Sequence, residues 1–110
     1  MLFNQITDND VLAVYAQLKD KYPVFMTTTG ALNEAMDAGM SIDCPILVGK
    51  VNRQILWLYA YEDIFVLDVL DEEQTKGTHW HPNDVKGAVD DIVEFMEGKT
   101  DYEMYPFKQI

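Results

Sequence analysis

The sequence predicts an α+β fold in one domain, residues 1–110, and three observations support this prediction. Residues near both ends follow the three-to-four spacing of amphipathic helices. The middle of the chain is rich in the aromatic and β-branched residues that favour strands. The connections in that region are too short for the crossovers between parallel strands. We therefore expect two N-terminal helices, a three- to four-stranded antiparallel meander sheet and a C-terminal helix packed on the sheet.

Two helices are predicted before the sheet. The first begins after Thr7, an N-cap residue, with Asp10 at the third helical position completing a variant of the capping box. Pro23 ends this segment. A second helix is predicted over residues 31–38, with Gly39 as its left-handed C-cap.

Three apolar runs predict the strands of the meander, and residues 24–26 are a possible fourth strand at its edge. The runs are separated by Asn52-Arg53 and by Glu62-Asp63, which we interpret as turns. The middle strand is apolar on both faces, so it is expected to be central. It would be covered on both sides, or covered on one side with a partner on the other. The three runs are residues 46–48, 55–61 and 64–70.

The C-terminal part is predicted to contain a loop, a helix and a packed tail. Residues 72–81 are polar and are expected to form the loop. The helix is predicted from Pro82 or Asn83 to Glu97, with an apolar stripe at helical spacing and Gly98 after its end. The remaining tail is too aromatic for a freely solvated segment, so it is expected to pack on its own domain or on a second subunit.

Composition argues against several classes of function. The 110 residues include 19 acidic and 8 basic side chains, and the formal net charge is -11. Such a charge repels nucleic acids and anionic membranes, so neither is expected as a partner. The N-terminus has no signal-peptide pattern, and no apolar run approaches the length of a membrane span. Cys44 is the single cysteine and fits a reducing compartment. We expect a cytoplasmic bacterial protein.

The candidates for catalysis are few, and we expect no cofactor. His79 and His81 alternate along an extended segment and could share a metal ion, with Asp68 as a third ligand. Further convincing ligands are missing. Cys44, followed by Pro45 in an apolar run, looks like a core residue rather than an activated nucleophile. A small metal-dependent or thiol enzyme using the two histidines is therefore an alternative to our main hypothesis.

The main hypothesis is a non-enzymatic module that binds a basic protein. Aromatic side chains on one face of the central strand and in the tail would anchor the partner, and acids on the last helix would attract it. The size, acidity and α+β plan are similar to those of bacterial immunity and antitoxin proteins, and this likeness implies a basic toxin as partner. A structural homodimer without ligand is a further alternative. The expected binding residues are Trp57, Tyr59, Tyr61, Asp90, Asp91, Glu94, Tyr105 and Phe107.

Overall fold

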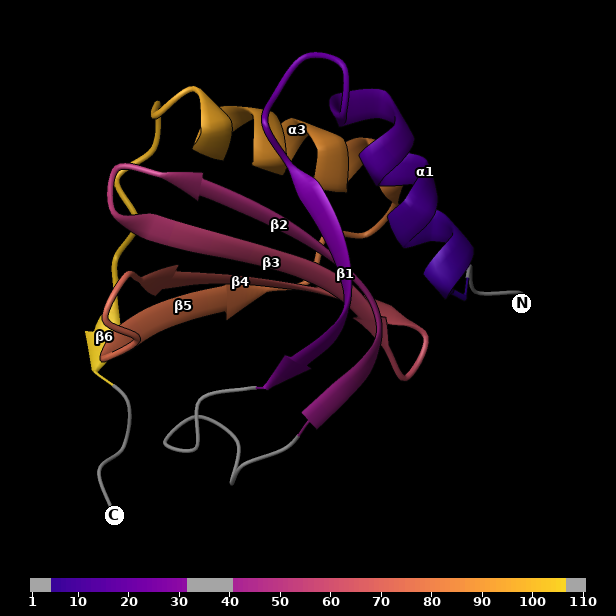
Figure 1. Cartoon of the computed structure of the whole chain (residues 1–110), viewed down its shortest axis with the longest axis horizontal. Coiled ribbons are helices and arrows are strands. Elements are labelled where there is room, and N and C mark those ends of the chain that lie inside the picture. Colours follow the sequence, from indigo (N-terminus) through magenta and orange to yellow (C-terminus); the bar gives the residue numbers. More distant parts are fainter. Residues whose placement is uncertain (1–4, 32–40, 107–110) are drawn as a thin grey trace.

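The computed structural model of the chain describes residues 5–31 and 41–106, which form a sheet of six strands with two helices. Every strand is antiparallel to its neighbours, and the order in the sheet is the order along the chain, β1 to β6. Helices α1 and α3 lie next to each other on the same side of the sheet (Figure 1). The elements are α1 (Asp8–Leu18), β1 (Phe25–Ala31), β2 (Ser41–Val51), β3 (Gln54–Tyr61), β4 (Ile64–Asp71), β5 (Lys76–Trp80), α3 (Val85–Met96) and β6 (Tyr105–Pro106).

The structure is α+β, but the predicted arrangement of two N-terminal helices and a three- to four-stranded sheet is wrong. One helix precedes the sheet in the described residues, and the chain after Pro23 forms the seven-residue strand β1. β1 contains the run Thr27 to Thr29, whose β-branched side chains suit a strand better than a helix start. Ala31, the expected first residue of a second helix, ends β1, and the rest of that predicted helix lies outside the described residues.

Two further strands lie where none was predicted. β5 occupies part of the predicted loop, because the Asp71 carboxylate turns the chain back beside β4. Its oxygens accept hydrogen bonds from the backbone of Thr75 and Lys76, at 2.7 and 2.9 Å, and from the Thr75 hydroxyl. β6 comes from the tail and pairs with β5. These additions raise the predicted meander to six strands.

Both described helices begin at a capped residue. The Thr7 backbone N–H donates to the Asp10 carboxylate over 2.8 Å, which confirms the predicted start of α1. α3 begins later than predicted, because its N-cap is Asp84, whose carboxylate accepts from the Gly87 backbone N–H at 2.7 Å. Gly98 follows α3 with a φ of +67°, in the left-handed conformation expected after a helix end.

The two predicted hairpin turns are confirmed by their backbone conformations. Asn52 and Arg53 have φ angles of 54° and 66°, and Glu62 and Asp63 have φ angles of 49° and 68°. Two consecutive positive φ values define the tight turn whose twist matches that of antiparallel strands. These turns fix the registers β2–β3 and β3–β4.

The main core lies between the two helices and the sheet. Gly49 on β2 lets α3 approach closely, because a Cβ atom there would lie 2.9 Å from the Met96 sulfur. Phe95 is buried in this core, although the sequence predicted an apolar stripe for this helix without it. The predicted stripe consisted of Val85, Ala88, Val89, Ile92, Val93 and Met96. The fully buried members of this core are Val11, Val14, Leu47, Leu56, Leu58, Phe65, Leu67, Val69, Ala88 and Ile92.

The segment after α3 packs on its own domain, one of the two outcomes expected for the tail. Tyr102 stacks on Trp80 with ring centroids 5.5 Å apart and an interplanar angle of 17°, and it also contacts Phe95. The Trp80 indole N–H donates to the Asp91 carboxylate over 2.7 Å. This aromatic cluster ties β5, α3 and the C-terminal segment together.

Candidate protein-interaction surface

The sheet has a second face that no helix in the described ranges covers, and we call it the open face. Alternate residues of a strand point to opposite sides. In β3, Leu56 and Leu58 therefore enter the core under the helices, whereas Trp57, Tyr59 and Tyr61 point the other way. The three aromatic residues that the sequence singled out thus share the open face.

The centre of the open face is a second, smaller apolar cluster. Ile46, Val48, Tyr59 and Val66 are buried there, and three half-buried residues pack against them. Those three are Cys44, Ile55 and Trp57. Strand register adds a row that crosses the sheet, formed by Phe25, Val48, Trp57, Asp68 and His79. This face is therefore apolar at its centre but carries one carboxylate.

Asp68 is that carboxylate, and only 1% of its surface is exposed. The Tyr59 hydroxyl donates to it over 3.3 Å. His79 lies opposite Asp68 on β5, and the His79 and His81 ring centroids are 5.7 Å apart. Across residues 5–31 and 41–106, no three His, Cys, Asp or Glu side chains are grouped closely enough to hold a metal ion.

Cys44 has the environment of a packed thiol rather than of a nucleophile. Desolvation by burial raises the pKa of its thiol, and the charges of Asp8 and Asp43 raise that pKa further. A nucleophilic cysteine needs positive surroundings that lower the pKa and produce the thiolate. The geometry therefore gives no support to a thiol enzyme.

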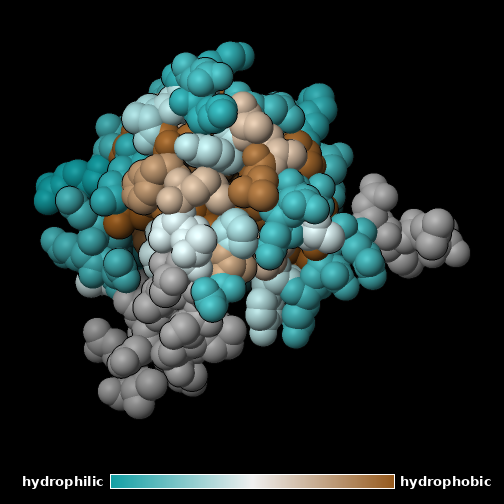
Figure 2. Space-filling model, turned by 45° about the vertical axis from the view of Figure 1, so that its right-hand side comes forward, coloured by the Kyte–Doolittle hydropathy of each residue, from teal (hydrophilic) through white to brown (hydrophobic). Residues whose placement is uncertain are grey.

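The rim of the open face exposes large apolar side chains. Tyr61 and Ile64 pair across the β3–β4 hairpin and are 44% and 43% exposed. Phe25 at the start of β1 and Tyr105 on β6 are also exposed. On a different side of the molecule, the side where α1 lies in Figure 1, Figure 2 shows hydrophobic residues in the middle with hydrophilic residues around them. Contiguous exposed apolar surface marks sites of protein interaction, and the Tyr61–Ile64 pair next to the packed centre is such a surface.

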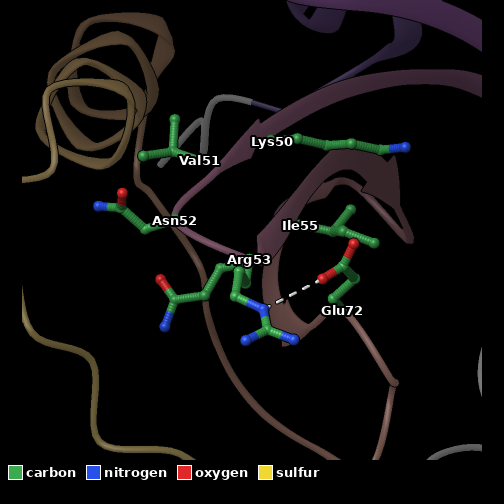
Figure 3. Close-up of a pocket in the computed structure, with 7 residues that line it drawn as sticks. Lys50, Val51, Asn52, Arg53, Ile55 and Glu72 are labelled. Atoms are coloured by element: carbon green, nitrogen blue, oxygen red, sulfur yellow. Dashed lines mark hydrogen bonds and ion pairs between the residues drawn. The ribbon is translucent and has the colours of Figure 1, made fainter.

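The hairpin tips at the two ends of β3 differ in charge. At the β2–β3 tip, Lys50, Arg53 and Glu72 line a hollow of about 260 Å³ (Figure 3). The Arg53 Nε lies 3.5 Å from a Glu72 oxygen, and Lys50 extends away from this pair. At the β3–β4 tip, Glu62 and Asp63 are both exposed and acidic. The first tip therefore mixes charges of both signs, whereas the second tip presents a cationic partner with acids alone.

A second hollow, of about 400 Å³, opens beside the acidic tip. Asp63 and Ile64 line it together with residues that precede the two helices. No pattern in the sequence indicated this hollow, because its walls come from three separate segments. Those other lining residues are Gln5, Ile6, His81, Pro82 and Asn83.

The structure does not bring the predicted aromatic and acidic groups together. Asp90, Asp91 and Glu94 lie on α3, on the helix side of the sheet. Asp91 accepts the Trp80 hydrogen bond, Asp90 is 3.1 Å from the Lys86 ammonium, and Glu94 accepts from Thr100. Tyr105 lies opposite Gly77 at the β5–β6 edge, and Phe107 lies outside the described residues.

Compared with protein-family models, curated proteins and solved structures, the chain matches none of them. Neither helix of the described part has the length and apolar character that crossing a bilayer requires. The function must therefore be argued from the surface itself.

Proposed function

We propose that this chain is a non-enzymatic protein-binding module that takes a basic protein on its open face, in the manner of an immunity protein. The observation that carries the proposal is the exposed pair Tyr61 and Ile64 at the rim of the open face, joined by the two acids of the β3–β4 turn. Apolar anchors that lie beside two negative charges fit a partner that is apolar at the centre of its contact surface and cationic at the edge.

The net charge of -11 supports the choice of partner. An acidic surface accelerates the encounter with a cationic protein, and salt screens this attraction over a Debye length of about 8 Å at physiological ionic strength. Affinity would depend mainly on the apolar anchors, because buried aromatic and aliphatic groups dominate most interfaces. The acids would govern the association rate.

The proposal is tested by pull-down from native lysate at low and moderate salt, followed by mass spectrometry. The Tyr61→Ser/Ile64→Ser variant should lose a basic protein that the wild type retains, and moderate salt should weaken retention by the wild type. Leu12→Ser is the matched control, because Leu12 is 45% exposed but lies on α1. The control should retain the basic protein.

Three outcomes would contradict the proposal. Recovery of neutral or acidic proteins alone would contradict the proposal that the partner is basic. A self-dimer as the single complex would favour the homodimer alternative. If the Tyr61→Ser/Ile64→Ser variant retained the basic protein as well as the wild type does, the open face would not be the docking surface.

A further inference from the structure

The hollow beside the β3–β4 turn is formed where three segments meet. The turn supplies Asp63 and Ile64, the chain before α1 supplies Gln5 and Ile6, and the rest comes from the chain before α3. A backbone hydrogen bond from Ile6 N–H to the Asp63 carbonyl, 3.0 Å long, joins two of these segments. The hollow therefore has a fixed wall even though it lies at the surface.

His81 presents an acceptor to its surroundings. Its Nδ1 lies 3.0 Å from the Phe65 backbone carbonyl oxygen. A carbonyl oxygen accepts hydrogen bonds and cannot donate them, so Nδ1 carries the proton. In the neutral ring, Nε2 is then left as an acceptor. The hydrogen bond to the backbone of β4 thus sets the tautomer of a residue that lines the hollow.

The other polar lining residues add acceptors and a negative charge. Asp63 supplies a carboxylate, and the side-chain amides of Gln5 and Asn83 can each accept through the oxygen or donate through the nitrogen. Among the residues that the structure describes, the lining of this hollow includes neither lysine nor arginine, whereas both occur in the hollow at the other end of β3. The electrostatic balance of this hollow therefore favours a ligand that is positive and rich in donors.

Apolar side chains complete the lining. Ile64 is partly exposed, and Ile6 and Pro82 are buried beside it. Together they offer a surface for a hydrocarbon chain. An arginine side chain has this combination, since an aliphatic stem packs on apolar groups while a planar head carries five N–H donors and no acceptor.

We propose that this hollow binds the side chain of an arginine presented by the partner protein. The inference rests on the proposed function and deepens it, because it names the group of a basic partner that the surface recognises. Asp63 would pair with the guanidinium, the stem would lie on Ile64, and Tyr61 would pack against the partner outside the hollow. Arginine anchors of this kind are common among the residues that dominate interface energies.

The test uses a small probe, N-acetyl-arginine methylamide, titrated into the whole chain and followed by amide NMR shifts. The expected result is saturable shifts around Asp63, Ile64 and His81 with a Kd in the range of about 1–10 mM, as suits a single side chain. The corresponding citrulline compound has the same shape but no charge. It should bind up to about fivefold more weakly, since one of the two charges of the exposed ion pair with Asp63 is gone.

Two variants with the same change of charge locate the site. Asp63→Asn should weaken the arginine probe about fivefold, the upper range for one exposed ion pair. Asparagine tolerates the positive φ of this turn position, so the hairpin should remain intact. Glu62→Gln is the matched control, because Glu62 lies in the same turn but does not line the hollow. It should leave the affinity within about twofold, since exposed charges outside the contact contribute little.

The inference is overturned if citrulline and arginine shift the same amides equally, or if Asp63→Asn and Glu62→Gln behave alike. It fails alone, with the proposed function intact, if the basic partner binds the open face but the arginine probe produces no shifts. The proposed function fails alone if the probe binds the hollow while Tyr61→Ser/Ile64→Ser still retains the partner.

Discussion

The two faces of the sheet are built from the same strands but differ in what covers them and in which side chains they carry. In β4, Phe65 and Leu67 point under the helices and are fully buried among aliphatic side chains. Ile64 and Asp68 point to the open face, where the first is exposed and the second is a buried carboxylate. One face is closed by the chain's own helices, whereas the other combines a packed centre with an exposed rim.

The difference is consistent with a helix-covered face that serves stability and with the recognition role that we propose for the open face. Burying a carboxylate is costly unless hydrogen bonds compensate, and the Tyr59 hydroxyl supplies one such bond to Asp68. A core selected for stability alone is better filled with aliphatic groups. The open face therefore carries polar groups and exposed anchors that the helix-covered face does without.

The largest expected difference in the free energy of unfolding is between substitutions at two neighbouring residues of β4 that point to opposite faces of the sheet. Phe65→Ala should lower the free energy of unfolding by about 3–5 kcal/mol, because it leaves a cavity in a closed core. Ile64→Ala should change it by less than about 1 kcal/mol, because its side chain is already 43% exposed. Urea denaturation measures both. Equal losses would mean that the open face is as important for folding as the helix-covered face.

A smaller difference in stability is expected between substitutions of two neighbouring acids of α3. Asp91→Ala removes the acceptor of the Trp80 indole and should cost about 1.5–3 kcal/mol, the usual range for a hydrogen bond to a charged group. Asp90→Ala removes an exposed pair with Lys86 and should cost less than about 0.5 kcal/mol. Both replacements introduce the same residue into the same helix, so helix propensity cancels. Thermal unfolding that ranks Asp90 above Asp91 would contradict the structural role given to Asp91.

The smallest effect concerns Asp71, at the end of β4, and depends on pH. Partial burial alone would raise the pKa of this carboxyl, but hydrogen bonds from Thr75 and Lys76 outweigh burial and lower the pKa below its ordinary value of 3.8. A lowered pKa stabilises the folded state above the ordinary value, and this stabilisation is lost as the pH falls through the folded pKa. Wild type should therefore be more stable than Asp71→Asn at neutral pH.

Below pH 3.8 the difference in stability between wild type and Asp71→Asn should shrink steadily. The measurement is a pair of denaturant midpoints at neutral and at acid pH. A difference that grows on acidification would show that the turn does not hold the ionised form of Asp71.

The sequence predicted local structure better than it predicted arrangement. Turn positions and the start of α1 depend on residues close together in the chain, and the structure confirms them. The sequence indicates β1 only as a possible edge strand over residues 24–26, because the threonines that follow are interpreted as the cap of a second helix. β6 has two residues and exists by pairing with β5, so no periodicity could reveal it.

The candidate site was predicted in part, for the same physical reason. Strand alternation places Trp57, Tyr59 and Tyr61 on one face, and that inference needs no tertiary information. The outward position of Asp91 on a helix was not enough to show that Trp80 would reach it across the packed layers. The hollow beside Asp63 requires the meeting of three distant segments, which a single sequence does not encode in any local pattern.

The strands lie in the sheet in the same order as along the chain, and this order affects the rate of folding. Each strand pairs with the strand that precedes it, so most of the sheet can form by successive closure of short loops. Chains with such local contacts have low contact order and fold quickly for β-rich proteins. The slow step should then be the docking of α1 on α3. The Tyr22 hydroxyl, after the end of α1, donates to Glu97, the C-cap residue of α3, across 75 residues of sequence. The face buried by that docking would be the last to close, and the open face would be complete before it.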